Sequence, residues 1–251
     1  MENSQDTYVH GMDWMKGELS DFELSNYRKY QFDLIGKYIG KQILEVGSGD
    51  RSFTAQITRH CKNIEKLVSI EPSQTLLDLY KDKYKFPDHI SFNRIDVFDL
   101  TPKEFGLFDT AIFVHVLEHI ENDRDALNHT FDLLLPGGLV LIEVPALPAL
   151  FSVHDEMLGH YRRYNKRSLL SIIDTDRYVV RDLWYQDMIG ILGSIYYFKL
   201  RKIQLQSAAG VELAKNQGQI YDRFLIPLQK GIEKFLRFPV GLSLTAVLER
   251  R

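Results

Sequence analysis

A group of reactive side-chain types lies between residues 154 and 164. His154 and His160 can exchange protons near neutral pH, which makes both candidate catalytic bases. The same stretch carries acids, arginines and tyrosines, which can bind anionic groups and form aromatic walls. We predict that it forms a substrate lid, and a structural loop held by salt bridges is the alternative. The predicted substrate-binding residues are Asp155, Tyr161, Arg162, Arg163 and Tyr164.

Carboxylates and imidazoles are also ligands for divalent metals, and His154, Asp155 and His160 supply such groups. Their spacing matches no standard metal-binding pattern. Cys61 is the only cysteine, so a disulfide within the chain is impossible and a thiolate cluster is implausible. We therefore expect no metal.

Two glycines mark a second candidate site. Gly47 and Gly49 follow a short apolar run and precede a segment with helical spacing. A side chain at either position would keep the backbone away from a bound nucleoside. A dinucleotide site would want a third glycine where Ser52 stands, which argues against an NAD-dependent enzyme.

Acidic residues follow the next two apolar runs. Glu71 can accept hydrogen bonds from the hydroxyls of a ribose, and capping of the helix near Ser73 is the alternative. Asp96, followed by the apolar Val97, can contact the amino group of an adenine, and a turn aspartate is the alternative. Ligands of open α/β sheets bind at the carboxyl ends of the strands. These positions together predict a nucleoside site at that edge.

The elements that must position these residues alternate along the chain from residue 42 onward. Short apolar runs alternate with helical spacing, which predicts βαβ units and a mainly parallel sheet covered on both faces. Pro136 to Gly138 is expected to end the last helix before the fifth strand. The predicted helices include Leu24–Ile39, Gln74–Tyr84 and Asp123–Leu135. The predicted strands are Gln42–Val46, Leu67–Glu71, Ile90–Ile95, Asp109–His115, Leu139–Val144, Tyr178–Trp184 and Ser243–Leu248.

Nothing in the chain resembles a flexible linker, and no internal repeat is visible, so we predict a single domain over residues 1–251. Residues 1–40 would form an N-terminal helical cap, and residues 41–145 the nucleoside-binding core. Residues 146–251 would supply a long substrate loop at Pro145–Tyr164, a helical insertion and the last strands. An apolar share of 45% is enough for a buried core.

Charge and hydropathy bear on whether the chain binds nucleic acid or a membrane. A net charge of −3 gives no reason to expect a nucleic acid, and the longest stretches without a charge are about half of what a spanning helix needs. The polar N-terminus shows no secretory signal, so we expect a cytoplasmic protein. The apolar run Met188–Leu192 lies near Lys199 and Arg201, which leaves peripheral membrane contact open beside burial in a monomer or homodimer.

Several motifs together resemble the class I S-adenosylmethionine-dependent methyltransferases, closely over residues 40–145. They are Glu45-Val46-Gly47-Ser48-Gly49, Glu71, Asp96, Phe108-Asp109-Thr110-Ala111-Ile112, Val116-Leu117-Glu118-His119-Ile120 and Leu135-Pro136-Gly137-Gly138. The resemblance implies a Rossmann-like α/β three-layer sandwich whose seven-stranded sheet has one antiparallel strand near an edge. It also implies S-adenosylmethionine as cofactor and S-adenosylhomocysteine as product. One departure is Arg51, where the family often has a third glycine.

The resemblance assigns roles to the strand-end residues. The glycine loop would approach the methionine moiety, the acid after the second strand would bind the ribose, and the acid after the third would recognise adenine. The implied cofactor-binding residues are Glu45, Gly47, Ser48, Gly49, Glu71, Pro72, Asp96, Val97 and His115. His119 is a third candidate base, although a role in shaping the cofactor pocket is favoured.

The acceptor is less defined than the cofactor. A hydroxyl acceptor would need a base, whereas a carboxylate or phosphate would need positioning by Arg162 and Arg163. The segment Pro239–Leu244 resembles the ending of methyltransferases encoded beside polysaccharide and glycolipid assembly enzymes, so we expect in-line O-methylation of a small molecule or a glycan-linked hydroxyl. The alternative is a catalytically silent binding or regulatory protein with a methyltransferase fold.

Overall fold

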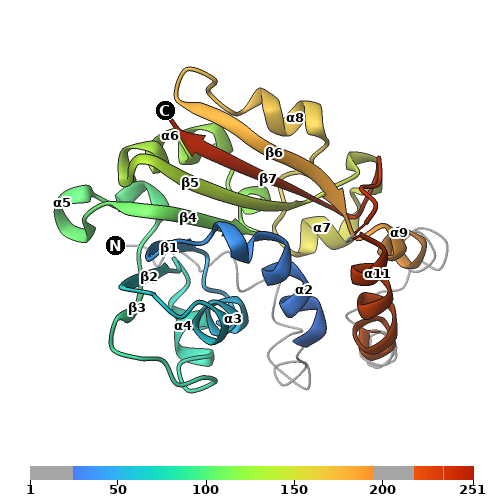
Figure 1. The fold of residues 1–251 in the computed structure, drawn as a ribbon, viewed down its shortest axis with the longest axis horizontal. Coiled ribbons are helices and arrows are strands. Elements are labelled where there is room, and N and C mark those ends of the chain that lie inside the picture. The colour runs from blue at the N-terminus through green and yellow to red at the C-terminus, as the bar shows by residue number, and fades with distance from the viewer. Residues whose placement is uncertain (1–24, 195–217, 234) are drawn as a thin grey trace.

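One seven-stranded sheet organises the chain in the computed structural model, which describes residues 25–194, 218–233 and 235–251 (Figure 1). The strands are β1 (Gln42–Val46), β2 (Lys66–Ile70), β3 (Ile90–Asn93), β4 (Phe108–Val114), β5 (Leu134–Pro145), β6 (Tyr178–Gln186) and β7 (Ser243–Arg250). The helices of the first half are α2 (Ser25–Ile35), α3 (Ser52–His60), α4 (Gln74–Leu79), α5 (Pro102–Phe105) and α6 (Asp123–Leu133). Those of the second half are α7 (Val153–Met157), α8 (Lys166–Ser171), α9 (Met188–Ser194) and α11 (Ile226–Glu233).

Short helical turns complete the path. They are η2 (Gly36–Tyr38), η3 (Val97–Asp99), η4 (Leu117–His119) and η5 (Pro148–Leu150), and the π-helical turn η7 (Tyr221–Leu225) leads directly into α11.

The strand order is β3-β2-β1-β4-β5-β7-β6. Strands β1 to β5 pair in parallel, whereas β7 runs antiparallel to both β5 and β6. The last strand of the chain therefore lies between two earlier ones. This arrangement confirms the expected seven-stranded, mainly parallel sheet with an antiparallel strand next to one edge.

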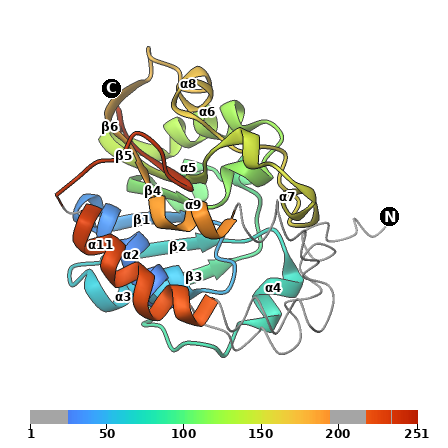
Figure 2. The ribbon, with the colours of Figure 1, turned by 90° about the vertical axis from the view of Figure 1, so that its right-hand side faces the viewer.

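Helices cover both faces of the sheet (Figure 2). On one face, α2 and α3 bury Phe32, Ile35, Phe53 and Ile57 against Ile43 and other strand residues. On the other face, α6 and α8 contribute the buried leucines Leu127, Leu133 and Leu169. The central strands are buried on both sides, which explains their nearly continuous apolar sequences.

All seven predicted strands are present, with ends that differ by a few residues. Two predictions about helix ends were wrong. The helix expected to run to Tyr84 ends at Leu79, because the guanidinium of Arg51 donates to the carbonyl oxygens of Leu77 and Lys81. The Pro136 to Gly138 turn does not end a helix but lies inside β5, where the pairing with β4 shifts register.

The C-terminal helical part is anchored to the N-terminal helix. Asp222 of η7 accepts hydrogen bonds from the backbone amides of Asn26 and Tyr27, at the start of α2. Residues 195–217 of the predicted helical insertion lie outside the described residues. Within the described part of the chain, no helix has the length and apolar character needed to cross a membrane.

Candidate active site

The glycine turn between β1 and α3 is held against the end of β2. The amides of Gly47 and Ser48 both donate to the carbonyl oxygen of Ile70, at 2.9 and 3.0 Å. Gly47 has a φ of 79°, and a Cβ there would lie 2.6 Å from the Val116 side chain. Glycine is therefore required at position 47 by both backbone conformation and space. The segment after β4 closes over this turn.

Arg51 occupies the position where a glycine was expected and has a φ of 62°. Its guanidinium donates to the carbonyl oxygens of Leu77 (2.9 Å) and Lys81 (3.0 Å). It also stacks on the Phe92 ring, 4.1 Å from the ring centroid. The left-handed conformation is thus retained without glycine, because these contacts offset its strain. The arginine points away from the glycine turn, toward α4 and β3.

Glu71 joins the glycine turn to the start of α4. Its two carboxylate oxygens accept hydrogen bonds from the amides of Gly49 and Ser73, each at 3.1 Å, and the residue is 4% exposed. Ser73, not Glu71, is the N-cap of α4. Each carboxylate oxygen has further lone pairs, so these bonds are compatible with ribose binding, which stays a prediction. Pro72 lies between these two residues.

Asp96 and Val97 follow β3, which ends at Asn93, and lie at the start of η3. The Asp96 carboxylate accepts a hydrogen bond from the amide of Phe98 at 3.0 Å and caps the turn η3. Val97 is buried at the base of that turn. The turn role of Asp96 is therefore present, and its contact with adenine stays a prediction.

Glu45 is buried inside the β1–α3 unit. Its carboxylate accepts hydrogen bonds from the hydroxyls of Thr54 (2.6 Å) and Ser69 (2.7 Å). Burial raises the pKa of Glu45 to about 7, and these hydrogen bonds offset that effect only in part. In this arrangement its observed contacts position β1, α3 and β2 relative to one another.

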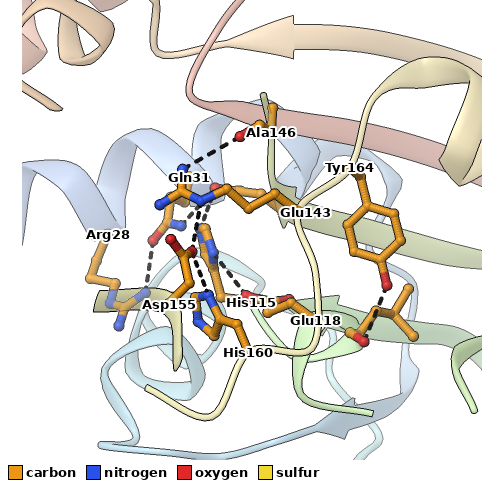
Figure 3. Close-up of polar contacts among 11 residues, drawn as sticks. Arg28, Gln31, His115, Glu118, Glu143, Ala146, Asp155, His160 and Tyr164 are labelled. Atoms are coloured by element: carbon orange, nitrogen blue, oxygen red, sulfur yellow. Dashed lines mark hydrogen bonds and ion pairs between the residues drawn. The ribbon is translucent and has the colours of Figure 1, made fainter. Parts of the chain in front are cut away.

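His115 lies between two fully buried carboxylates at the end of β4 (Figure 3). Its Nδ1 is 3.3 Å from Glu118 Oε1, and its Nε2 is 3.2 Å from Glu143 Oε1. Burial alone would lower the pKa of His115, but the two carboxylates outweigh it and raise the pKa to about 9. His115 is therefore a cation at neutral pH. Gln31 of α2 also donates to Glu143, at 2.7 Å.

A second histidine group comes from the loop after α7. His160 Nδ1 is hydrogen-bonded to Asp155 at 2.9 Å, and its ring contacts that of His119 edge-on, with centroids 4.6 Å apart. Burial would raise the pKa of Asp155, but hydrogen bonds from His160 and Arg163 hold it at about 2. Burial lowers the pKa of His119, and the nearby Glu118 offsets this only in part. Asp155 is thus an ionised partner that orients His160.

The remaining residues of the loop hold it in place. Arg162 pairs with Asp123 at 2.6 Å, and Arg163 pairs with Asp155 at 2.6 Å. The Tyr164 hydroxyl is buried and donates to Asp123 at 2.8 Å. These contacts favour the structural-loop alternative for those three residues, and substrate contact by them stays a prediction.

Tyr161 and His154 differ from that group. The Tyr161 amide donates to the carbonyl oxygen of Glu118, which fixes the loop beside η4, while its ring is exposed. His154 lies in the first turn of α7 and is half-buried. The structure therefore brings His119 and His160 together, and a catalytic part for any of the three histidines stays a prediction.

Sequence reasoning did not find Glu143, Gln31 or Asp50. Asp50 follows Gly49 directly and pairs with Lys83 at 2.9 Å. Glu143 is the one charge in the apolar run 139–144, and Gln31 lies on the buried side of α2. A charged or amide side chain on an otherwise apolar face is a signal for a buried polar site, and it was available in the sequence.

Comparison with known families and relatives is consistent with this geometry. The family model described as a methyltransferase domain matches residues 27–185. A ubiquinone biosynthesis O-methyltransferase of Psychrobacter cryohalolentis is 23% identical over 103 residues, which cover 41% of this chain and 40% of that protein. A ubiquinone/menaquinone biosynthesis C-methyltransferase of Vibrio campbellii is 21% identical over 163 residues, 62% of each chain. The match therefore spans less than two thirds of these relatives.

Solved structures show the same fold over nearly the whole chain. The N-methyltransferase NodS from Bradyrhizobium japonicum, in complex with S-adenosylhomocysteine, is 15% identical, covers 98% of both chains and has a TM-score of 0.59. The plantazolicin methyltransferase BpumL, also in complex with that molecule, is 12% identical with a TM-score of 0.57. It covers 99% of this chain and 91% of its own. At these identities the likeness concerns the fold.

Proposed function

Because this chain belongs to the methyltransferase domain family, we propose that it transfers a methyl group from S-adenosylmethionine to a hydroxyl oxygen. The proposed acceptor is a small molecule or a glycan-linked group. The cofactor would lie over the glycine turn at Gly47 to Gly49, with Glu71 at the ribose and Asp96 at the adenine. His115 follows β4, beside the predicted methionine end.

The observation that carries the hydroxyl acceptor is the Asp155–His160–His119 arrangement. An ionised, buried Asp155 fixes the Nδ1 side of His160, and its other nitrogen can then take a proton. The guanidinium groups that an ionised acceptor would need are engaged, Arg162 by Asp123 and Arg163 by Asp155. An acceptor that must lose a proton is therefore favoured over a carboxylate or phosphate.

The proposed step conserves atoms and charge. The acceptor oxygen gives its proton to His160 and attacks the methyl carbon of the sulfonium. The carbon–sulfur bond breaks, its electron pair stays on sulfur, and S-adenosylhomocysteine leaves. Alignment of the two reactants and exclusion of water supply most of the rate, since the cofactor already carries an activated methyl group.

Calorimetric titration with S-adenosylhomocysteine tests the cofactor. Glu71→Ala should weaken binding about tenfold to hundredfold, because the ribose hydroxyls lose a charged acceptor. Glu104→Ala, which removes an exposed carboxylate of α5, is the matched control and should bind like the wild type. Circular dichroism confirms that each variant is folded. Equal binding by the wild type and Glu71→Ala would remove the ribose role of Glu71.

Transfer of a labelled methyl group to sugars, phosphosugars and quinols tests the reaction. His160→Gln should lower kcat about 10²- to 10⁴-fold on an accepted hydroxyl compound, the usual contribution of a positioned base. His89→Gln, a change at an exposed histidine, should leave it unchanged. Cofactor binding without transfer to any acceptor would instead support the silent binding protein.

A further inference from the structure

Three side chains converge beside the proposed acceptor position. Glu118 and His119 come from η4, and His160 comes from the loop after α7. One potential ligand atom from each lies within 4.8 Å of the other two. We propose that Glu118, His119 and His160 bind a divalent transition-metal cation. The binding site stands on these contacts alone, whereas the role of the ion in methyl transfer rests on the function proposed above.

Glu118 is the strongest indication of a missing ligand. It is fully buried, and among the described residues neither of its carboxylate oxygens accepts a hydrogen bond. Its Oε1 lies 3.3 Å from His115 Nδ1, a charge contact that leaves the lone pairs of both oxygens without a donor in hydrogen-bond geometry. The charge of His115 offsets part of the cost of burying this carboxylate, and coordination to a further cation would satisfy its remaining lone pairs.

His160 is oriented by a carboxylate on one ring nitrogen, as metal-binding histidines usually are. Its Nδ1 is hydrogen-bonded to Asp155, which leaves Nε2 as the coordinating atom. Asp155 is itself held by Arg163 at 2.6 Å and by the amide of Ser152 at 2.9 Å. A carboxylate behind a histidine fixes the ring and raises its basicity in many metal sites.

The charges around the cluster favour a cation. Three carboxylates in and beside the cluster are buried. Glu118 belongs to it, Glu143 contacts His115, and Asp155 contacts His160. Among the described residues, the cations that pair with these carboxylates are His115 and Arg163. Even with both of these charged, the carboxylates are in excess. Two imidazoles and a carboxylate are the donor set of zinc, cobalt and iron sites, not of calcium or magnesium.

The geometry allows the three side chains to reach one ion if their ligand atoms move closer together. The rings of His119 and His160 lie at 83° to each other, so their nitrogens can approach one ion from different directions. Ligands about 2.1 Å from a tetrahedral ion are about 3.4 Å apart, so the three atoms, now within 4.8 Å of one another, would approach by as much as about 1.4 Å on binding. With three protein ligands, one position stays open for an exogenous oxygen.

The open position is where an acceptor hydroxyl would bind. The ion would withdraw electron density from that oxygen and lower its pKa, as a metal does for bound water. In the ion-bound protein His160 would be a ligand and could not also be the base described above. The ion would then replace it in activating the hydroxyl, whose proton would pass to solvent. The oxygen then attacks the methyl carbon as described above. His115 keeps its contact with Glu143 in this state.

Titration of the metal-free protein with Zn²⁺, and with Co²⁺ followed by visible absorption, tests the site. We expect one ion per chain and a Co²⁺ spectrum typical of nitrogen and oxygen ligands. Glu118→Gln and His160→Gln should each weaken binding at least tenfold, and Asp155→Asn about tenfold through loss of support. His89→Gln should bind like the wild type, because His89 is exposed and distant in sequence from the cluster.

Absence of stoichiometric binding, or equal binding by Glu118→Gln and the wild type, would overturn the site. Retained binding of S-adenosylhomocysteine by each variant shows that the fold is intact. The proposed function is tested separately by cofactor binding and methyl transfer. If the ion binds but its removal leaves transfer to a hydroxyl acceptor unchanged, the site stands and its catalytic role is wrong.

Discussion

At the scale of single residues, ionisable side chains are buried wherever strands β1, β4 and β5 end. Glu45, Glu118 and Glu143 have almost no exposure to solvent, and each is held differently. Among the described residues, Glu143 contacts a histidine cation and an amide, whereas Glu45 accepts hydrogen bonds from two hydroxyls. Burial is therefore compensated by charge at Glu143 but not at Glu45.

The pH dependence of stability should reflect Glu45. Burial raises its pKa from 4.5 to about 7 in the folded protein, so between these values the folded state binds a proton that the unfolded state has released. The contribution of Glu45 to the free energy of unfolding is full below about pH 4.5 and is lost as the pH rises through 7.

Glu45→Gln should remove that dependence. Urea unfolding at pH 5 and pH 8 measures the effect. The free energy of unfolding of the wild type should fall between these pH values, and the fall should be smaller in the variant by an amount on the order of 1–3 kcal/mol. Glu65→Gln, which removes an exposed carboxylate, is the matched control and should keep the decline of the wild type. An identical slope in wild type and Glu45→Gln would mean that Glu45 is ionised in the folded protein.

At the scale of elements, contacts between distant segments decide where helices begin and end. The guanidinium of Arg51, before α3, donates hydrogen bonds to carbonyl oxygens at the end of α4. The carboxylate of Asp222, in η7, accepts hydrogen bonds from the backbone amides at the start of α2. The first amides and last carbonyls of a helix have no partner inside it, so a side chain from elsewhere can satisfy them. Such caps are specified by the fold and not by neighbouring sequence.

The cap on α2 should contribute to stability. Asp222→Ala should cost about 1–2 kcal/mol and increase amide exchange in the first turn of α2, because Asn26 and Tyr27 lose a charged acceptor. Hydrogen exchange measured by mass spectrometry resolves this helix from the rest. Asp176→Ala, an exposed acid in the turn before β6, is the matched control. Unchanged exchange in α2 would show that the cap carries no stability.

At the scale of the whole molecule, β7 joins β6 to the parallel strands β1 to β5 in one sheet. It pairs with β5 along Leu139–Pro145 and with β6 along Tyr178–Gln186. Trp184 of β6 packs in the same buried cluster as residues of α2 and α3. A sheet and core shared in this way should unfold together, which is the single-domain prediction in physical terms.

Coincident unfolding curves would confirm that prediction. In a Trp14→Phe variant, Trp184 is the remaining tryptophan and reports on β6. Its fluorescence and the far-UV circular dichroism should follow urea with the same midpoint, since both report one cooperative transition. Separate midpoints would mean that residues 146–251 form a unit of their own.

The sequence by itself determined the strands, their parallel core and the nucleoside end of the site. Apolar runs, glycine positions and acids at strand ends are local signals, so Gly47, Glu71 and Asp96 were found at the sheet edge where they were expected. The same local signals predicted a functional loop around His160. They also indicated a methyltransferase through the resemblance of consecutive motifs.

Only the tertiary structure decided which of these residues meet. Three features join segments that are far apart in the chain. They are the insertion of β7 between β5 and β6, the contact of His115 with Glu143, and the convergence of Glu118 and His119 with His160. No periodicity or spacing encodes such contacts, because they depend on strand order and on how the loop after α7 folds back onto η4. Arg51 is the clearest case, since its partners and its left-handed backbone become evident only when α4 and β3 are in place.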